Sequence, residues 1–177
     1  LSLIHWCERY IQTIPSELLN KNRDFQEILN HNINNSIEIR IKRIIDIFFS
    51  ISLLLLTSPI IFFVSLIIKF EDGGPIFYSQ IRTGIYGKTF KIFKLRSMKM
   101  NSEKEGPQWS SRDDSRVTRV GKVIRKARID ELPQLFSVII GEMSLIGPRP
   151  ERPEIEEELI KEIPHYKLRN QFKPGIS

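Results

Sequence analysis

Two adjacent carboxylates, Asp130 and Glu131, are the residues whose types and spacing best suit catalysis. They stand just before Pro133, which is favoured in the first turn of a helix, and upstream of Gly141, a natural helix stop. Acidic residues at such a position often only cap the helix and complement its dipole. The same field keeps a carboxylate ionised, as a nucleophile or a metal ligand requires. The pair is therefore either a structural cap or a centre that holds Mg²⁺ against a diphosphate.

Basic residues gather around this pair. Residues 70–150 carry 15 basic and 9 acidic groups, which accounts for the whole formal charge of +6. A helix predicted from Arg119 places most cations opposite an apolar face; the cations are Arg119, Lys122, Arg125, Lys126 and Arg128, and the apolar residues are Val120, Val123, Ile124 and Ala127. Such a helix can lie on an anionic membrane, flank a phosphate site or present an ordinary solvated face. The charge indicates an anionic partner.

A stiff loop, Gly147-Pro148-Arg149-Pro150-Glu151-Arg152-Pro153, follows the carboxylates. Proline on both sides of Arg149 prevents regular helix. A stiff loop suits the presentation of guanidinium groups to phosphate, which arginine grips in a bidentate way. The alternative is a polar surface turn without a function. The nearby carboxylate pair favours the phosphate role.

Other kinds of site find little support. The one cysteine, Cys7, excludes an internal disulfide and a multi-cysteine metal site. The three histidines are scattered and lack the spacing of a zinc site. Gly87-Lys88-Thr89 resembles the end of a P-loop, but Arg82 stands where the first glycine of that motif is required. An NTPase is therefore rejected.

A long apolar segment must help to position these groups. Ile47 to Ile68 is a run of 22 residues without a charge. At about 1.5 Å per residue, a helix of this length spans the ~30 Å hydrocarbon core of a bilayer. A soluble core helix rarely lacks a polar face over such a length, so the run predicts membrane insertion. Asp46 stands at its edge, where helical pairing with Lys42 or Arg43 gives it a structural role.

Ser58 and Pro59 interrupt this run near its centre. Pro59 has no N–H, so the carbonyl of Leu55 loses its helical partner. In lipid that carbonyl needs another donor, and the hydroxyls of Thr57 and Ser58 are close enough to serve. Basic residues flank the run on both sides, so the charges do not indicate a simple crossing. A re-entrant helix and a kinked spanning helix both remain open on this evidence.

The other expected elements are a hairpin and a short helix. Two strand-like stretches, Ile76–Ile81 and Thr89–Leu95, are joined by the glycine-containing segment 83–88. Beyond the carboxylates, the pattern predicts a helix whose buried face consists of Leu132, Leu135, Phe136 and Ile139.

Taken together, these features resemble the bacterial sugar transferase family, the monotopic polyprenyl-phosphate phosphoglycosyl transferases. The similarity runs from about Lys42 to Ser177. Its motifs are Lys-Arg-x-x-Asp at 42–46, Ser58-Pro59, Gly-Pro-Ile-Phe-Tyr-x-Gln at 74–80, Phe-Lys-Leu-Arg-Ser-Met at 93–98, Arg-Val-Thr-Arg-Val-Gly at 116–121, Asp-Glu-Leu-Pro-Gln-Leu at 130–135, Gly-Glu-Met-Ser-Leu-Ile-Gly-Pro-Arg-Pro at 141–150 and Lys-Pro-Gly-Ile at 173–176. So many motifs in one order are highly specific.

The resemblance implies an α+β, mostly helical fold. Residues 1–40 are then a linker from an upstream region. Residues 41–70 form a re-entrant membrane helix that turns at Ser58-Pro59, and residues 71–177 form a small cytoplasmic catalytic domain with a short β-hairpin. The expected location is the cytoplasmic face of the bacterial inner membrane, in contact with membrane lipid. No nucleic acid is expected as a partner. Whether the chain forms a homo-oligomer is left open by the resemblance.

The resemblance also implies a reaction. Asp130 attacks the β-phosphate of a UDP-sugar, UMP leaves, and undecaprenyl phosphate then takes the phosphosugar from the aspartate. Glu131, together with Asp130, is expected to bind Mg²⁺. Lys94, Arg96, Arg125 and Arg149 are the expected phosphate contacts. The enzyme would start the synthesis of an exopolysaccharide, a capsule or the O-antigen of a lipopolysaccharide.

The sugar is expected to be a hexose such as glucose or galactose, with an N-acetylated amino sugar as the alternative. Relatives usually continue past the Pro-Gly-Ile segment, so we expect residues beyond Ser177 to be missing. Ser115 replaces a proline common in the family, with little effect expected. The rival from another class is a membrane-tethered basic module that binds anionic lipid or nucleic acid and needs no carboxylate pair.

Overall fold

The computed structural model describes residues 36–100, 102, 114–163 and 166–176. The chain divides into two compact units, Leu1–Ile44 and Ile45–Ser177. Of the first unit, the structure describes the start of one helix. The expected linker at 1–40 thus lies almost wholly outside the described residues. The second unit contains all of the expected site residues.

Helix α4, Ser36–Asp72, contains the whole apolar run. Within the described residues it is the helix long and apolar enough to cross a membrane, judged by length and composition. Large apolar side chains are exposed along it, among them Phe48, Leu55, Leu56 and Phe70. Exposure of so much apolar surface on one element is typical of a segment in lipid or in an interface.

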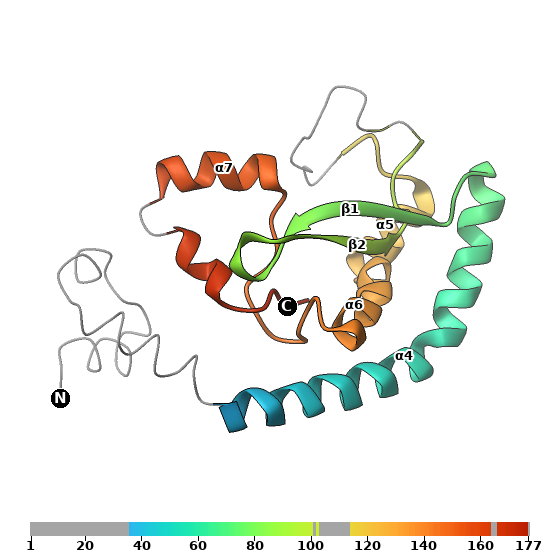
Figure 1. The fold of residues 1–177 in the computed structure, drawn as a ribbon. Coiled ribbons are helices and arrows are strands. Elements are labelled where there is room, and N and C mark those ends of the chain that lie inside the picture. Colours follow the sequence, from blue (N-terminus) through green and yellow to red (C-terminus); the bar gives the residue numbers. More distant parts are fainter. Residues whose placement is uncertain (1–35, 101, 103–113, 164–165, 177) are drawn as a thin grey trace, which may run out of the picture. The chain divides into compact units, whose positions relative to one another are not determined.

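Pro59 lies inside α4, and the helix continues through it. Ser58 Oγ donates a hydrogen bond to the carbonyl of Leu55 at 2.8 Å. This is the carbonyl that proline leaves without a helical partner, and the prediction for Ser58 is confirmed. Thr57 instead donates to the carbonyl of Leu53 at 2.7 Å. The expected interruption is therefore a bend in one helix, which Figure 1 shows where the teal part of α4 meets the green part.

The end of α4 is fastened to the rest of the unit by packing and by polar contacts. Ile68, 1% exposed, packs with Leu95 and Ile124. Glu71 Oε1 accepts the backbone N–H of Arg119 at 3.0 Å, so the end of α4 caps the next helix of the chain. Asp72 forms an ion pair with Arg96. The polar end of α4 therefore belongs to the second compact unit, Ile45–Ser177.

Asp46 makes a second connection between α4 and the unit. Its carboxylate is 5% exposed. It accepts a hydrogen bond from Ser144 Oγ at 2.8 Å and another from the backbone N–H of Leu145 at 3.2 Å. These contacts extend the structural role expected for Asp46, while its pairing with Lys42 or Arg43 stays a prediction.

Strands β1 (Phe77–Thr83) and β2 (Thr89–Leu95) form the expected antiparallel hairpin. The register pairs Phe77 with Leu95 and Thr83 with Thr89. A 3-10 turn, η1 (Ile85–Gly87), closes the loop. Gly87 has φ +75°, a conformation that glycine adopts without strain.

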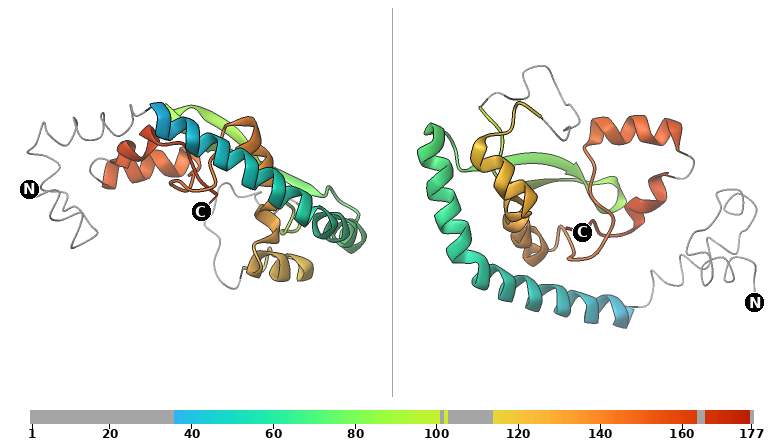
Figure 2. Two further views of the ribbon diagram at one scale, coloured as in Figure 1. Left: turned by 90° about the horizontal axis from the view of Figure 1, so that it is seen from below. Right: turned by 180° about the vertical axis from the view of Figure 1, so that it is seen from behind.

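Three short helices pass behind the hairpin: α5 (Arg119–Lys126), η2 (Ile129–Gln134) and α6 (Leu135–Ile140). Thr118 caps α5 by accepting the N–H of Gly121, and Gly141 ends α6 with φ 100°. Figure 1 and the rear view in Figure 2 show α5 near the open end of the hairpin and α7 near its loop end.

Two residues of the predicted apolar helix faces are exposed: Val123 at 66% and Phe136 at 55%. In α5 the buried side is made by Gly121 and Ile124, because Gly121 packs against the carbonyl of Ser97 with no room for a Cβ. For Phe136 the prediction assumed one α-helix from the carboxylates onward. The 3-10 geometry of η2 changes the phase, so α6 buries Val138 in place of Phe136, while Leu135 is buried as predicted.

Helix α7 (Pro153–Glu162) and the 3-10 helix η3 (Tyr166–Gln171) complete the described elements. After η3, the chain returns beside residues 144–148. Gly175 donates its N–H to the carbonyl of Pro148 at 3.0 Å, and Ser144 pairs with Gly175 in a parallel bridge. A Cβ on Gly175 would lie 2.2 Å from the nitrogen of Gly147, so both glycines permit this close approach.

Candidate active site

The carboxylate pair lies in the 3-10 helix η2. This helix begins directly after Arg128, a residue in the left-handed conformation with φ 57°. Asp130 is 8% exposed and Glu131 7% exposed. Burial of two adjacent acids is costly unless charges or hydrogen bonds compensate it. This placement is deeper than that of an ordinary surface cap.

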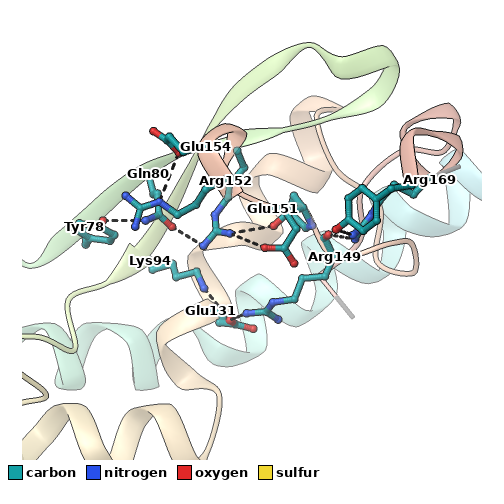
Figure 3. A network of polar contacts seen from close by, with 12 residues as sticks. Tyr78, Gln80, Lys94, Glu131, Arg149, Glu151, Arg152, Glu154 and Arg169 are labelled. Carbon is teal, nitrogen blue, oxygen red and sulfur yellow. Dashed lines mark hydrogen bonds and ion pairs between the residues drawn. The ribbon is translucent and has the colours of Figure 1, made fainter. Parts of the chain in front are cut away.

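Glu131 is surrounded by cations. Its Oε1 accepts hydrogen bonds from Lys94 Nζ at 2.8 Å and from Arg149 at 2.7 Å, and its Oε2 lies 3.4 Å from Arg128. Figure 3 shows Lys94 and Arg149 converging on Glu131 from the hairpin and from the proline-rich loop. Burial alone would raise the pKa of Glu131, but Lys94 and Arg149 outweigh it and lower that pKa to about 2. Glu131 is therefore a firmly ionised anchor.

Asp130 differs from its neighbour. Burial raises the pKa of Asp130 above its usual value, and the charge of Glu131 adds to this, while Lys94 and Arg125 oppose it. The two adjacent acids thus have pKa values shifted in opposite directions. Such a divergence is characteristic of carboxylates with different roles in one site.

Lys94 reaches the carboxylates from β2, where it pairs with Tyr78 of β1. Strand β2 packs against η2, so a side chain on this face of the hairpin points at the pair. Burial lowers the pKa of Lys94, and the adjacent Glu131 opposes that effect. Lys94 is thus a buried partner of Glu131, and its role as a phosphate contact stays a prediction.

The loop that carries Arg149 is held from several sides. Thr83 donates its N–H to the carbonyl of Glu151 at 2.9 Å, and Arg82 donates to the carbonyl of Pro150 at 3.2 Å. Gly175 holds Pro148 from the C-terminal segment, and Arg169 donates to the carbonyl of Arg149 itself. The Arg149 side chain stays 49% exposed. The loop is fixed while its guanidinium remains accessible.

The structure thus brings together five of the expected site residues: Asp130, Glu131, Lys94, Arg125 and Arg149. Arg125 acts on Asp130 through its charge. Arg96 lies elsewhere, at the base of the hairpin, where it pairs with Asp72 at the end of α4. Its role as a phosphate contact stays a prediction. Ser58 and Pro59 lie in α4, away from the carboxylates in the chain.

Three residues near the pair were not among the expected site residues: Arg82, Arg128 and Gln134. Arg128 contacts Glu131, and Arg82 holds the arginine loop. Gln134 is 4% exposed and follows Glu131 by three positions. The 3-10 period of three, had it been recognised, would have placed Gln134 on the same side as Glu131.

Asp130 and Glu131 are the carboxylates expected to bind Mg²⁺. Within the part of the chain that the structure describes, there is no group of three or more His, Cys, Asp or Glu residues able to hold a metal ion. Mg²⁺ commonly binds one or two carboxylates and completes its shell with water and substrate phosphates. Asp130 and Glu131 supply two carboxylates. These residues fit a magnesium ion that is held jointly with a diphosphate.

A family model and several known proteins match this chain. The family model described as "Bacterial sugar transferase" matches residues 37–177. A protein of Bacillus subtilis (strain 168), provisionally named as an undecaprenyl-phosphate N-acetylgalactosaminyl 1-phosphate transferase, is 51% identical over 129 residues, which cover 73% of this chain and 72% of that protein.

Two longer relatives also match. The UDP-N-acetylgalactosamine-undecaprenyl-phosphate N-acetylgalactosaminephosphotransferase of Aeromonas hydrophila is 49% identical over 77% of this chain. The UDP-glucose:undecaprenyl-phosphate glucose-1-phosphate transferase of Klebsiella pneumoniae is 39% identical over 81% of this chain. The aligned parts are 32% and 31% of these two proteins, so this chain spans about a third of their length.

Proposed function

The chain belongs to the bacterial sugar transferase family, and on that premise we propose that it transfers a sugar-1-phosphate from a UDP-sugar to undecaprenyl phosphate. The observation that carries the proposal is the pair of buried, adjacent carboxylates with oppositely shifted pKa values. Three cations, Lys94, Arg128 and Arg149, stand around that pair. A diphosphate substrate needs this combination of a nucleophile and charge-neutralising groups.

The reaction proceeds in two displacements at one phosphorus atom. An oxygen of Asp130 attacks the β-phosphorus, the bond from that phosphorus to the bridging oxygen breaks, and UMP leaves with the electron pair. An oxygen of undecaprenyl phosphate then attacks the same phosphorus. The bond to Asp130 breaks, the carboxylate is regenerated, and the product is undecaprenyl diphosphate sugar. The raised pKa of Asp130 supports its role, because a more basic carboxylate is the better nucleophile once ionised.

The other residues hold and orient the donor. Lys94 and Arg149 neutralise the diphosphate, and Glu131 keeps both cations in place. Arg125 favours the ionised form of Asp130 through its charge. Asp130 and Glu131 would hold Mg²⁺, which supplies charge neutralisation at the diphosphate when bound. This assignment gives Glu131 a positioning role and Asp130 the covalent one.

We infer that α4 is a re-entrant membrane helix, with both ends at the cytoplasmic face of the inner membrane. The bend at Pro59 and its compensating bond from Ser58 support this topology. The fastening of both Asp46 and Ile68 to the catalytic unit supports it further, because residues near the two ends of the apolar run contact the same unit. The active site then lies where a lipid phosphate emerges from the bilayer.

The identity of the transferred sugar is the most specific part of the proposal. Relatives named for N-acetylgalactosamine are 51% and 49% identical, whereas relatives named for glucose are 39% to 43% identical. We therefore place the N-acetylated amino sugar ahead of the hexose expected from the sequence. The lipid-linked product would begin the synthesis of a surface polysaccharide.

The test is release of UMP from a panel of UDP-sugars by the chain in detergent or nanodiscs. We expect release that requires undecaprenyl phosphate for turnover and Mg²⁺ for rate, with UDP-N-acetylgalactosamine ahead of UDP-glucose. A chain that binds anionic vesicles but releases no UMP from any donor would contradict the proposal and favour a basic binding module. Chelation by EDTA followed by added Mg²⁺ checks the metal separately.

A further inference from the structure

A small cavity is lined by Lys94 and Arg149, the two residues that donate hydrogen bonds to Glu131 Oε1. The volume of this cavity is about 10 Å³, which is enough for a single oxygen atom. Its polar side-chain lining comes from Arg82, Lys94, Gln134 and Arg149. Three of these four residues are cations, and the described lining includes no carboxylate.

Two buried donors in this lining have no partner. Gln134 is 4% exposed, and its Nε2 finds no hydrogen-bond acceptor in the described structure. The Nε of Arg82 is likewise buried and without an acceptor, although the other guanidinium nitrogens bind Pro150 and Gln80. Leaving a buried donor unsatisfied costs free energy. Two such donors at one cavity indicate a site built for an acceptor that is absent here.

Helix η2 and the hairpin position these donors. Glu131 and Gln134 are three residues apart in the 3-10 helix η2, where side chains at that spacing lie one above the other. Arg82 and Lys94 lie on the two strands of the hairpin, which packs against η2. The cavity therefore shares Lys94 and Arg149 with the contacts that hold Glu131.

The charges indicate what kind of oxygen the cavity takes. A water molecule would bring two hydrogens of its own to a wall whose side chains present mainly donors. A neutral sugar hydroxyl would bring one. An anionic oxygen brings none, and it adds to the partial compensation that Glu151, 3.6 Å from Arg82, gives the buried guanidinium, whose burial lowers the pKa of Arg82.

We propose that Gln134 and Arg82 form a binding site for one phosphoryl oxygen of a substrate, next to the catalytic carboxylates. The proposal rests on the proposed function and adds to it two residues that bind phosphate. The oxygen belongs either to the diphosphate of the donor or to the phosphate of the lipid acceptor. Both present the same chemistry to the cavity.

Two substitutions at Gln134 test the proposal. Gln134→Leu keeps approximate size and removes the donor. Gln134→Glu places a carboxylate among Arg82, Lys94 and Arg149, where it satisfies the donors itself and excludes an anion. We expect Gln134→Glu to be at least as resistant to thermal unfolding as the parent, so that a loss of binding cannot be attributed to misfolding.

The measurements use the full chain in nanodiscs. Titration calorimetry with UDP reports the donor arm, and the KM for undecaprenyl phosphate at saturating donor reports the acceptor arm. We expect one of the two to weaken roughly ten- to a hundredfold in Gln134→Leu, and at least as much in Gln134→Glu. Which arm changes identifies the source of the oxygen.

Gln171 supplies the matched control, because it lines a separate cavity beside α7. Gln171→Leu and Gln171→Glu should leave both arms within twofold of the parent. If both Gln134 variants fold and also leave both arms unchanged, the cavity holds water and the proposal is wrong. In that outcome UMP release by the parent would still stand, whereas a parent that releases no UMP contradicts the proposed function instead.

Discussion

The hydroxyl of Ser144 donates to the carboxylate of Asp46 at 2.8 Å, across 98 positions of sequence. Asp46 stands at the edge of the apolar run of α4, and Ser144 stands between the carboxylate pair and the loop of Arg149. Leu145 adds a backbone N–H to the same carboxylate. This contact links α4 to the segment between the carboxylate pair and Arg149.

Removal of that hydroxyl should weaken the link. We expect Ser144→Ala to lower the free energy of unfolding by about 1.5–3 kcal/mol, because a buried charged acceptor loses one of its hydrogen-bond donors. Thermal unfolding in detergent measures this effect. Ser52→Ala is the control, since Ser52 is exposed on α4 and its hydroxyl binds only the carbonyl of Phe48 in the same helix. Equal stability of the two variants would mean that the Asp46 contact contributes nothing.

Glu131→Gln should cost stability in a pH-dependent way. The pKa of Glu131 is lowered to about 2 in the folded protein, from an ordinary value near 4.5. Its ionised form therefore stabilises the fold fully above pH 4.5, and this contribution is lost as the pH falls towards 2. We expect the parent to unfold at higher denaturant than Glu131→Gln at pH 7, with the gap narrowing between pH 4.5 and 3. A gap that is constant with pH would show that the charge of Glu131 is not its source.

Much of this architecture follows from local chemistry that the sequence displays. Because Pro59 has no N–H, the sequence predicts that the carbonyl of Leu55 needs a hydroxyl donor. Ser58 supplies this donor. The hairpin was predicted with its second strand at the observed bounds, Thr89–Leu95, because apolar and aromatic residues there are bounded by a glycine loop. Such features depend on near neighbours in the chain.

The remaining features depend on geometry that no short pattern encodes. The 3-10 form of η2 shifts the phase of the following helix, which exposes Phe136 and brings Gln134 beneath Glu131. The register of the hairpin determines that Arg82 reaches the proline-rich loop. Arg96 was grouped with the phosphate contacts by its motif alone, and in the structure it forms an ion pair with Asp72.

The re-entrant topology has its own test. Single cysteines replace Glu38, before the apolar run, and Lys88, in the exposed hairpin loop, in a Cys7→Ala background. We expect a membrane-impermeant thiol reagent to label both from the cytoplasmic side of oriented vesicles. Labelling of the two positions from opposite sides would establish a spanning helix. In Pro59→Ala, where the proline-induced bend is relieved, we expect some molecules to show that opposite-sided pattern.

The central claim is that Asp130 carries the phosphosugar covalently. The direct measurement is intact mass of the chain after incubation with a UDP-sugar and Mg²⁺ in the absence of undecaprenyl phosphate, with released UMP counted in parallel. We predict an adduct with the mass of one phosphosugar, mapped to Asp130, together with about one UMP per chain, and neither in Asp130→Asn. An Asp130→Asn protein that still forms the adduct, or that releases UMP as fast as the parent when the lipid acceptor is present, would contradict the account.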